Sequence, residues 1–207
     1  MPETKMEQRT LSAELRAESE GDEFALAGYA ALFNSESKPI LGVFRETIAP
    51  GAFDRALREK QLVRFTFNHS LNAVLARTDN GTLQLSTDAK GLKFRAQLNR
   101  RIQLHSDLWE ACRSGLYTEC SFVFSVPSPS GEKWSPDGKK RTLLDVDLFD
   151  CSLVGEPAYN GTSAAARSDN ADYFAAVSAR LETMRADWAR RDKAHELEMR
   201  LIAERSK

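Results

Sequence analysis

Short runs in which apolar and polar residues alternate, each ended by turn residues, are the feature that most limits how this chain can fold. Three typical runs are 24–33 (FALAGYAALF), 62–67 (LVRFTF) and 92–98 (LKFRAQL). Alternation with a period of two residues predicts strands with one buried face. Because these runs recur between turns, we expect a mainly β protein of the α+β class, with an antiparallel, barrel-like core and flanking helices.

Helical and turn patterns interrupt these strands at a few places. Residues 52–60 (AFDRALREK) have helical spacing, and residues 107–116 (DLWEACRSGL) read as a helix closed by a glycine. Residues 79–81 (DNG) carry a hairpin signal. The polar segment 127–140 is expected to be a mobile excursion, and residues 141–155 are expected to form one long strand or two bent ones.

The end of the chain follows a different pattern. Residues 170–207 contain no Gly or Pro. Apolar residues then recur at alternating spacings of three and four, at Phe174, Val177, Leu181, Met184 and Trp188. This spacing is that of a narrow helical seam. We expect a C-terminal helix that packs either on its own domain or against another copy or another protein.

Composition excludes several classes of protein. The 207 residues include 29 Lys and Arg against 30 Asp and Glu, a formal net charge of -1, so a nucleic acid is not expected as partner. No long apolar run predicts a membrane span, and the N-terminus lacks the apolar core of a signal peptide. The 3 Cys have no CxxC spacing, which argues against a disulfide framework or structural zinc and fits a reducing cytosol.

The 3 His limit the search for a catalytic base. His195 lies among charged residues of the C-terminal segment, as a solvated surface residue would. His105 lies near the start of a predicted helix, where a structural role is expected. His69 directly follows the predicted strand 62–67 and is well placed to project into a cleft from a rigid element.

A nucleophile and an acid are less clearly marked by the residues alone. Ser121 is a small hydroxyl inside the apolar strand 118–126 (TECSFVFSV), and Ser152 has a similar context in DCSLV. The acids near the end of the domain are Asp145, Asp147 and Asp150. A buried carboxylate needs an N–H partner, and an imidazole would provide one. These alternatives stay open on residue type alone.

Several motifs occur in one order along residues 24–167, and together they resemble one known family. They are GYAALFN (28–34), IAPGAF (48–53), FNHS (67–70), VLARTDNGTLQLSTDAKGLKFRAQL (74–98), CSFVF (120–124) and LFDCSLVGEPAYNGTSAAAR (148–167). This set resembles the tailed-bacteriophage prohead proteases, also called capsid maturation proteases, which are similar in fold to the herpesvirus assembly proteases.

The resemblance implies a serine endopeptidase that needs no metal or cofactor. It assigns His69 as the base, Ser121 as the nucleophile and Asp150 as the acid. His105 remains an outside candidate for the third member, because the herpesvirus relatives use a second His there. The chain departs from the family pattern at Val123, where Gly is common. The loop 155–158 is the expected source of backbone N–H donors for the oxyanion.

The same resemblance implies an organisation and a biological setting. We expect a flexible N-terminal segment at 1–23, the protease domain at 24–167 and a C-terminal helix at 168–207 with an association or scaffold-like role, which is also a candidate for removal by self-cleavage near Arg167. The expected substrates are the scaffolding segment of the major capsid protein and the protease itself, cleaved in the host cytoplasm inside the assembling prohead. Self-association is expected, and no membrane or nucleic-acid partner. The alternative function is a non-enzymatic scaffold or capsid-assembly protein.

Overall fold

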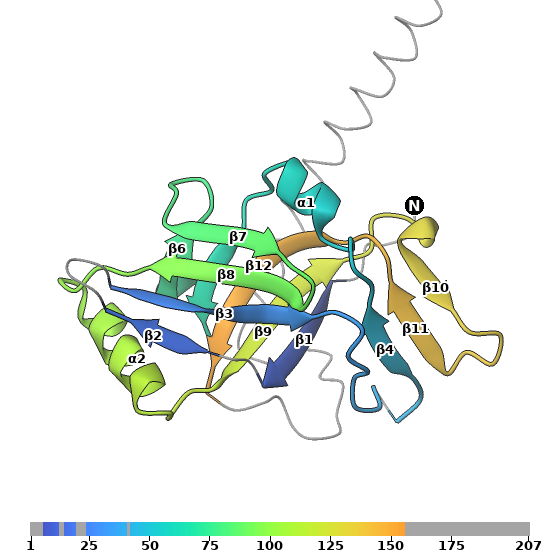
Figure 1. Cartoon of the computed structure of the whole chain (residues 1–207), viewed down its shortest axis with the longest axis horizontal. Helices are drawn as coiled ribbons and strands as arrows, with labels where there is room; N and C mark the ends of the chain where they lie inside the picture. The colour runs from blue at the N-terminus through green and yellow to red at the C-terminus, as the bar shows by residue number, and fades with distance from the viewer. Residues whose placement is uncertain (1–5, 13–14, 20–23, 41, 156–207) are drawn as a thin grey trace, which may run out of the picture. The chain divides into compact units, whose positions relative to one another are not determined.

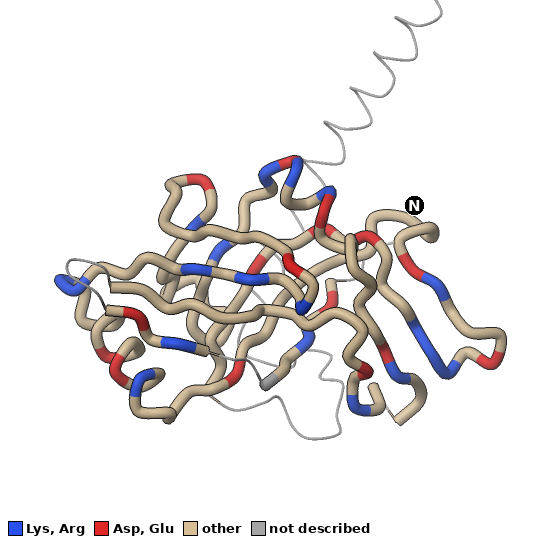
Figure 2. Tube along the Cα trace, in the orientation of Figure 1, with Lys and Arg blue, Asp and Glu red and all other residues tan. Residues whose placement is uncertain are grey.

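The computed structural model describes residues 6–12, 15–19, 24–40 and 42–155 (Figure 1). These residues form a mainly β fold with two short α-helices, which confirms the fold class at that level. No helix in this part of the chain is long and apolar enough to span a membrane. Basic and acidic residues are mixed along the described chain (Figure 2).

The first sheet has five strands and carries the candidate catalytic residues. Its order is β1 (Glu7–Ser12), β9 (Glu119–Ser125), β12 (Asp147–Val154), β5 (Arg64–Phe67) and β6 (Val74–Arg77). The central strand β12 pairs antiparallel with β9 and parallel with β5. All eight residues of β12 are buried, so both of its faces are covered.

The second sheet has four strands and packs over the first. Its order is β2 (Arg16–Glu18), β3 (Ala25–Leu32), β8 (Gly91–Gln97) and β7 (Leu83–Thr87). It lies in front of the five-stranded sheet in the view of Figure 1.

Aromatic residues join these two sheets in the core. The ring of Phe65 on β5 stacks on the ring of Phe94 on β8, with centroids 4.6 Å apart. Phe122 on β9 also contacts Phe53, which belongs to neither sheet, edge-on with centroids 5.9 Å apart. Burial of each such side chain stabilises the fold by about 1.5–3 kcal/mol, so the apolar face of the five-stranded sheet is fixed against the second sheet.

The third sheet and the helices lie around these layers. The sheet has the order β10 (Glu132–Trp134), β11 (Lys140–Leu143) and β4 (Arg45–Ile48), and β11 pairs parallel with β4. The α-helices are α1 (Asp54–Arg58) and α2 (Gln103–Arg113). Short 3-10 turns occur at Leu71–Ala73 and Pro129–Gly131.

The predicted antiparallel barrel is wrong. The described strands form three open sheets, and two strand pairs, β12 with β5 and β11 with β4, are parallel. Turn residues predict where a chain reverses, but they do not say which sheet the next strand enters. The turn at 79–81 illustrates this, because it leads from β6 in the first sheet to β7 in the second, and the hairpin is instead the one between β7 and β8.

The other predictions of helices and strands agree with the structure to different degrees. The predicted strands at 24–33, 62–67 and 92–98 correspond to β3, β5 and β8, while the second helix begins and ends earlier than expected. The polar excursion contains β10, and residues 141–155 form two strands. Strands β1 and β2 precede residue 24, where no strand was expected. The expected C-terminal helix and the segment around Arg167 lie outside the described residues.

Buried ion pairs fasten β1 to the third sheet. Arg141 on β11 binds Glu7 of β1 at 2.6 Å and Glu46 of β4 at 2.9 Å, and Arg9 of β1 binds Glu46 at 2.7 Å. Glu132 of β10 also pairs with Arg141. The side chain of Glu46 is only 3% exposed, so this is an interior network and not a surface ion pair.

Candidate active site

The turn after β5 directs His69 back over the five-stranded sheet. Asn68 and His69 have φ angles of 51° and 55°, in the left-handed region that non-glycine residues rarely adopt. The cost of about 1–2 kcal/mol for each residue is offset by specific hydrogen bonds. The His69 N–H donates to Ser152 Oγ at 2.9 Å, and the Asn68 side-chain oxygen accepts from the Gly155 N–H at 3.1 Å. Asn tolerates this conformation well, which gives the Asn-His pair a physical reason.

Three side chains meet in one hydrogen-bonded line. His69 Nδ1 lies 2.6 Å from Asp150 Oδ2, and His69 Nε2 lies 2.8 Å from Ser121 Oγ. The geometry fits a neutral imidazole whose Nδ1–H donates to the carboxylate while its Nε2 accepts from the serine hydroxyl. Ser121 and Asp150 are 0% exposed and His69 is 3% exposed. The three residues singled out by the sequence are thus brought together by three separate strands or strand ends.

The environment of Asp150 sets its electrostatics. Burial raises the pKa of Asp150, whereas the hydrogen bond and charge of His69, the hydroxyl of Thr66 and the positive charge of Arg64 act in the opposite direction. Thr66 Oγ1 donates to Asp150 Oδ2 at 3.0 Å, and Oδ1 has no hydrogen-bond partner among the described residues. A desolvated carboxylate is well suited to stabilise positive charge on the imidazole beside it.

Strand register explains why small hydroxyls occur inside these apolar strands. Ser121 on β9 lies opposite Ser152 on β12, which lies opposite Thr66 on β5. Residues that are directly opposite share one face of a sheet. Their neighbours Phe122 and Leu153 point to the other face and belong to the apolar core. Thr66 was not predicted as a site residue, although a hydroxyl between two phenylalanines in β5 was a usable signal.

Ser152, the rival nucleophile, has a different set of contacts. Its Oγ accepts a hydrogen bond from the His69 backbone N–H. The same hydroxyl donates a hydrogen bond to the Thr66 carbonyl oxygen, 3.1 Å away. It also lies 3.1 Å from the Thr66 hydroxyl, and none of these hydrogen bonds reaches the imidazole ring. The geometry gives Ser152 the role of holding the turn that carries His69.

His105 is separated from the line by its own hydrogen bonds. Its Nδ1 accepts the Asn99 N–H at 3.0 Å, and burial lowers its pKa against the effect of a hydrogen bond to the Val74 backbone. Both contacts join the start of α2 to neighbouring backbone, so the structure does not bring His105 to Asp150 or Ser121. His195 lies outside the described residues.

The other two acids bind an arginine of α1. Arg55 Nε lies 2.8 Å from Asp145, and Arg55 also contacts Asp147 at 2.7 Å. Gln61 donates a further hydrogen bond to Asp147 at 2.8 Å. Arg55 thus attaches α1 to Asp147 of β12 and to Asp145 just before that strand, and none of the described contacts of these two acids is with His69.

The cysteines offer no competing nucleophile. Cys112, Cys120 and Cys151 are all buried as free thiols. Burial raises the pKa of Cys112 to about 12 and raises the pKa values of the other two as well, so their reactive thiolate forms are suppressed. Within the described ranges, no group of three or more His, Cys, Asp or Glu residues is arranged to hold a metal ion.

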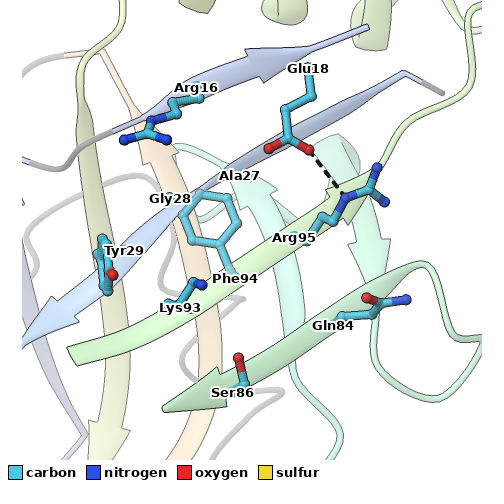
Figure 3. Close-up of a pocket in the computed structure, with 10 residues that line it drawn as sticks. All are labelled: Arg16, Glu18, Ala27, Gly28, Tyr29, Gln84, Ser86, Lys93, Phe94 and Arg95. Carbon is cyan, nitrogen blue, oxygen red and sulfur yellow. Dashed lines mark hydrogen bonds and ion pairs between the residues drawn. The ribbon is translucent and has the colours of Figure 1, made fainter. Parts of the chain in front are cut away.

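A separate groove of about 370 Å³ lies on the outer face of the four-stranded sheet (Figure 3). Charged side chains line it, and Glu18 forms an ion pair with Arg95 at 3.2 Å. Arg16 and Lys93 flank the small residues of β3 that form its floor. None of the three residues in the hydrogen-bonded line belongs to this groove, so it is separate from the candidate active site.

A serine hydroxyl, an imidazole and a buried carboxylate in one hydrogen-bonded line, on a mainly β fold, form the arrangement of a serine peptidase. The model of the family described as Caudovirus prohead serine protease matches residues 11–176, and the chain belongs to this family. It is therefore a serine peptidase of phage capsid assembly. The resemblance drawn from the sequence motifs is confirmed at the level of the family.

Comparison with solved structures gives a more distant similarity. The chain is similar to the bacteriophage T4 capsid assembly protease, gp21, with 9% sequence identity and a TM-score of 0.49. The similarity covers 75% of this chain and 98% of that chain. Comparison with curated proteins found no match.

Proposed function

We propose that Ser121, His69 and Asp150 are the catalytic triad of this peptidase, and that its substrates are proteins of the assembling prohead. The observation that carries the proposal is the continuous line of hydrogen bonds, 2.6 Å from Asp150 to His69 and 2.8 Å from His69 to Ser121. Family membership supports the reaction class, and the geometry supports the role of each residue.

The chemistry follows from the direction of the hydrogen bonds. His69 Nε2 takes the proton of Ser121 Oγ as the oxygen attacks a peptide carbonyl, and the protonated imidazole then gives that proton to the leaving amine. A water molecule, activated by His69 in the same way, hydrolyses the acyl-enzyme. Asp150 keeps the Nδ1 proton in place and stabilises the imidazolium. Because Asp150 is buried, its charge acts on the imidazolium with little screening by water.

The developing oxyanion needs backbone N–H donors, each worth roughly 3–4 kcal/mol in such sites. The sequence pointed to the loop 155–158 for these donors. The Gly155 N–H donates instead to the Asn68 side chain, so it serves the turn that carries His69. Residues 156–158 lie outside the described part of the chain.

We infer that the substrates are the scaffolding segment of the major capsid protein and the protease itself, with self-cleavage near Arg167. Cleavage would take place inside the assembling prohead in the host cell. Capsid-protein cleavage is the activity that the family description and the order of motifs favour. The hydrogen-bonded line of Ser121, His69 and Asp150 favours the peptidase over the alternative, a non-enzymatic scaffold function, which the apolar seam at 174–188 and the departure at Val123 would suit.

Co-expression of the chain with the major capsid protein of the same phage tests this proposal. Mass spectrometry should detect defined fragments of the capsid precursor and of the protease with the wild-type chain. The Ser121→Ala variant should yield the intact precursor. Equal processing by that variant would show that Ser121 is not the nucleophile, and an intact precursor with the wild-type chain would refute the substrate assignment.

A further inference from the structure

Among the described residues, the two sides of the strand that carries Ser121 have different neighbours. β9 lies between β12 and β1 in the five-stranded sheet (Figure 1). His69 occupies the β12 side, because its ring contacts Asp150 of that strand and its N–H contacts Ser152 of the same strand. A peptide carbonyl that approaches Ser121 Oγ must therefore extend over the β1 side.

The pairing of β1 with β9 determines which side chains lie there. Thr10 is directly opposite Ser121, and Gln8 is directly opposite Val123. Directly opposite residues point to the same face of a sheet, so Thr10 and Gln8 share the face of the nucleophile. Both side chains are partly exposed, which leaves them accessible to a ligand.

The alternate residues of β1 support this assignment of faces. The guanidinium of Arg9 lies over the ring of Phe124, 5.3 Å from its centroid, and Leu11 packs against the apolar core. Phe124 belongs to the core cluster on the face opposite to Ser121. Arg9 and Leu11 thus point away from the nucleophile, and Gln8 and Thr10 must point toward its side.

Distances decide how a peptide can bind. Side chains of directly opposite residues have Cβ atoms about 4.5–5.5 Å apart, so Thr10 is a near neighbour of Ser121. In the described sheet β1 is the edge strand, and a peptide added as a further strand beside it would lie two strand spacings, or about 9.5 Å, from β9. Attack requires an approach of about 3–3.5 Å. The peptide must therefore cross the face of the sheet, over β1, and cannot simply extend its edge.

We propose that Thr10 and Gln8 form the wall of the substrate cleft on the side of Ser121 opposite His69, and that they select the residues next to the scissile bond. The inference rests on the proposed role of Ser121 as nucleophile. Thr10, Gln8 and Val123, which is opposite Gln8, carry no charge. The one acid that alternation places on this face of β9, Glu119, lies opposite Ser12 and not opposite Thr10 or Gln8. The favoured substrate is a peptide with uncharged residues at the positions that contact them.

The ion-pair network gives this wall a fixed position. Arg9 and Glu7 of β1 are held by Glu46 and Arg141 of the third sheet. Because these residues alternate with Gln8 and Thr10, the network holds the strand without occupying the face that carries Ser121. Substrate selection by Thr10 and Gln8 needs this rigidity, since a more mobile β1 would allow many different substrate side chains to bind.

The test uses the full chain and a ten-residue peptide that spans the capsid cleavage site mapped by the co-expression experiment. Thr10→Trp should lower kcat/KM for this peptide by about 10²-fold, because a bulky side chain displaces the peptide from attack geometry. Labelling of Ser121 by a small fluorophosphonate should stay within about twofold, since a small probe needs no extended cleft. Ser86→Trp, on the exposed face of the edge strand β7, is the matched control and should change neither rate.

Two outcomes would overturn the inference. If kcat/KM is unchanged in Thr10→Trp, the peptide does not pass over Thr10. If peptide cleavage and labelling fall together while circular dichroism remains that of the wild type, Thr10 supports the nucleophile and not the substrate. Failure of the wild-type chain to react with the fluorophosphonate would instead refute the proposed function, so the two failures are distinguishable.

A charge introduced at the same position gives a second test if the Trp variant does not fold. Thr10→Lys should favour a peptide with Glu next to the scissile bond over the same peptide with Lys, by about tenfold in kcat/KM relative to wild type. An unchanged ratio would show that Thr10 does not contact those residues.

Discussion

Two buried serines on neighbouring strands differ in what their hydroxyls contact, and this difference separates their roles. Ser121 faces the imidazole of His69, whereas Ser152 faces the backbone of the turn that carries it. We expect Ser121→Ala to abolish fluorophosphonate labelling and peptide cleavage without loss of stability beyond about 1 kcal/mol. Ser152→Ala should keep labelling detectable but destabilise the fold by about 1–3 kcal/mol, because the His69 N–H loses its buried acceptor.

Labelling and urea unfolding of the two variants check this prediction. Labelling that persists in Ser121→Ala and disappears in Ser152→Ala would reverse the two roles. A Ser152→Ala variant as stable as wild type would show that the His69 turn does not depend on this hydrogen bond.

Asp150 should contribute to catalysis because its carboxylate accepts a hydrogen bond from His69, and not because of its volume. Asp150→Asn keeps the size but can present an N–H to His69 Nδ1, which moves the imidazole proton to Nε2 and blocks acceptance from Ser121. We expect kcat to fall by about 10⁴-fold. The matched control is Asp145→Asn, because among the described residues the Asp145 carboxylate binds Arg55 and its side chain is 35% exposed.

Steady-state kinetics with the mapped peptide decide the case. A loss in Asp150→Asn of less than about tenfold would mean that another group orients His69. A comparable loss of kcat in Asp145→Asn would mean that any lost carboxylate in this part of the chain has the effect, and that the role of Asp150 in the triad is not its cause.

At the residue scale, the sequence allowed much of the candidate site to be proposed. Ser121 and Asp150 stood out as polar groups inside apolar strands, and His69 as a polar residue at a strand end. Residue type could not separate Ser121 from Ser152, because both have the same local context and lie opposite each other in the sheet. Only the family motifs chose between them, and the distinguishing contacts arise from the positive φ angles at Asn68 and His69, which no periodicity reveals.

Among the elements, β1 depends on an interior charge network for its attachment. Arg141→Ala would leave the carboxylate of Glu46 in a buried site without this partner, at a cost of about 3–5 kcal/mol. The control is Arg113→Ala, which removes a surface ion pair with Glu110 whose side chains are more than half exposed and should cost less than about 1 kcal/mol. Chemical denaturation of both variants measures the difference, and equal costs would show that the network does not stabilise the fold.

Acid should weaken the same attachment. Burial alone would raise the pKa of Glu7, but hydrogen bonds and charges from Arg141 and Arg9 lower it overall. The unfolded chain takes up a proton on Glu7 below about pH 4.3, whereas the folded chain holds the charge to lower pH. The contribution of Glu7 to stability is therefore complete above that pH and is lost as the pH falls toward the folded-state pKa.

The Glu7→Gln variant isolates this contribution. Unfolding free energies measured from pH 7 to pH 3 should show a smaller acid-induced loss in the variant than in the wild type, together with lower stability at neutral pH. Parallel curves for the two proteins would refute the assignment to Glu7.

Among the elements, the strands that the sequence did not predict are β1 and β2. β1 and β2 have the sequences EQRTLS and RAE, which lack a clear apolar alternation. They are strands because β9 and β3 offer pairing partners and because β1 gains ion pairs from the third sheet. Such strands are defined by contacts distant in sequence, whereas β3, β5 and β8 carry their own apolar faces and were predictable.

At the scale of the molecule, one sheet carries both the core and the chemistry. The apolar face of the five-stranded sheet packs against the four-stranded sheet, and its other face carries Ser121, Asp150 and Ser152. The two functions share strands without competing, because alternate residues point to opposite faces. This arrangement does not require a closed barrel. Open sheets can therefore hold Ser121, His69 and Asp150 in one line, although the sequence predicted a barrel.

The C-terminal part of the chain lies outside the described residues, but its sequence pattern supports a prediction about assembly. Residues 170–207 lack Gly and Pro and carry a narrow apolar seam from Phe174 to Trp188, whereas the motifs of the protease domain end at Arg167. A seam of this width suits a partner helix better than a globular core. We expect a chain that ends at Arg167 to fold and to cleave the mapped peptide, but to lose self-association.

Light scattering and peptide kinetics on the shortened chain, compared with the full chain, make the test. The family match extends to residue 176, so a second chain ending there separates an effect of the domain boundary from an effect of the seam. If the chain ending at 176 also loses association while both keep activity, the seam beyond it mediates the contact, since a two-heptad helix is only marginally stable alone and needs a partner. If the chain ending at Arg167 unfolds, or if its oligomeric state equals that of the full chain, the C-terminal residues belong to the catalytic domain and the association role is wrong.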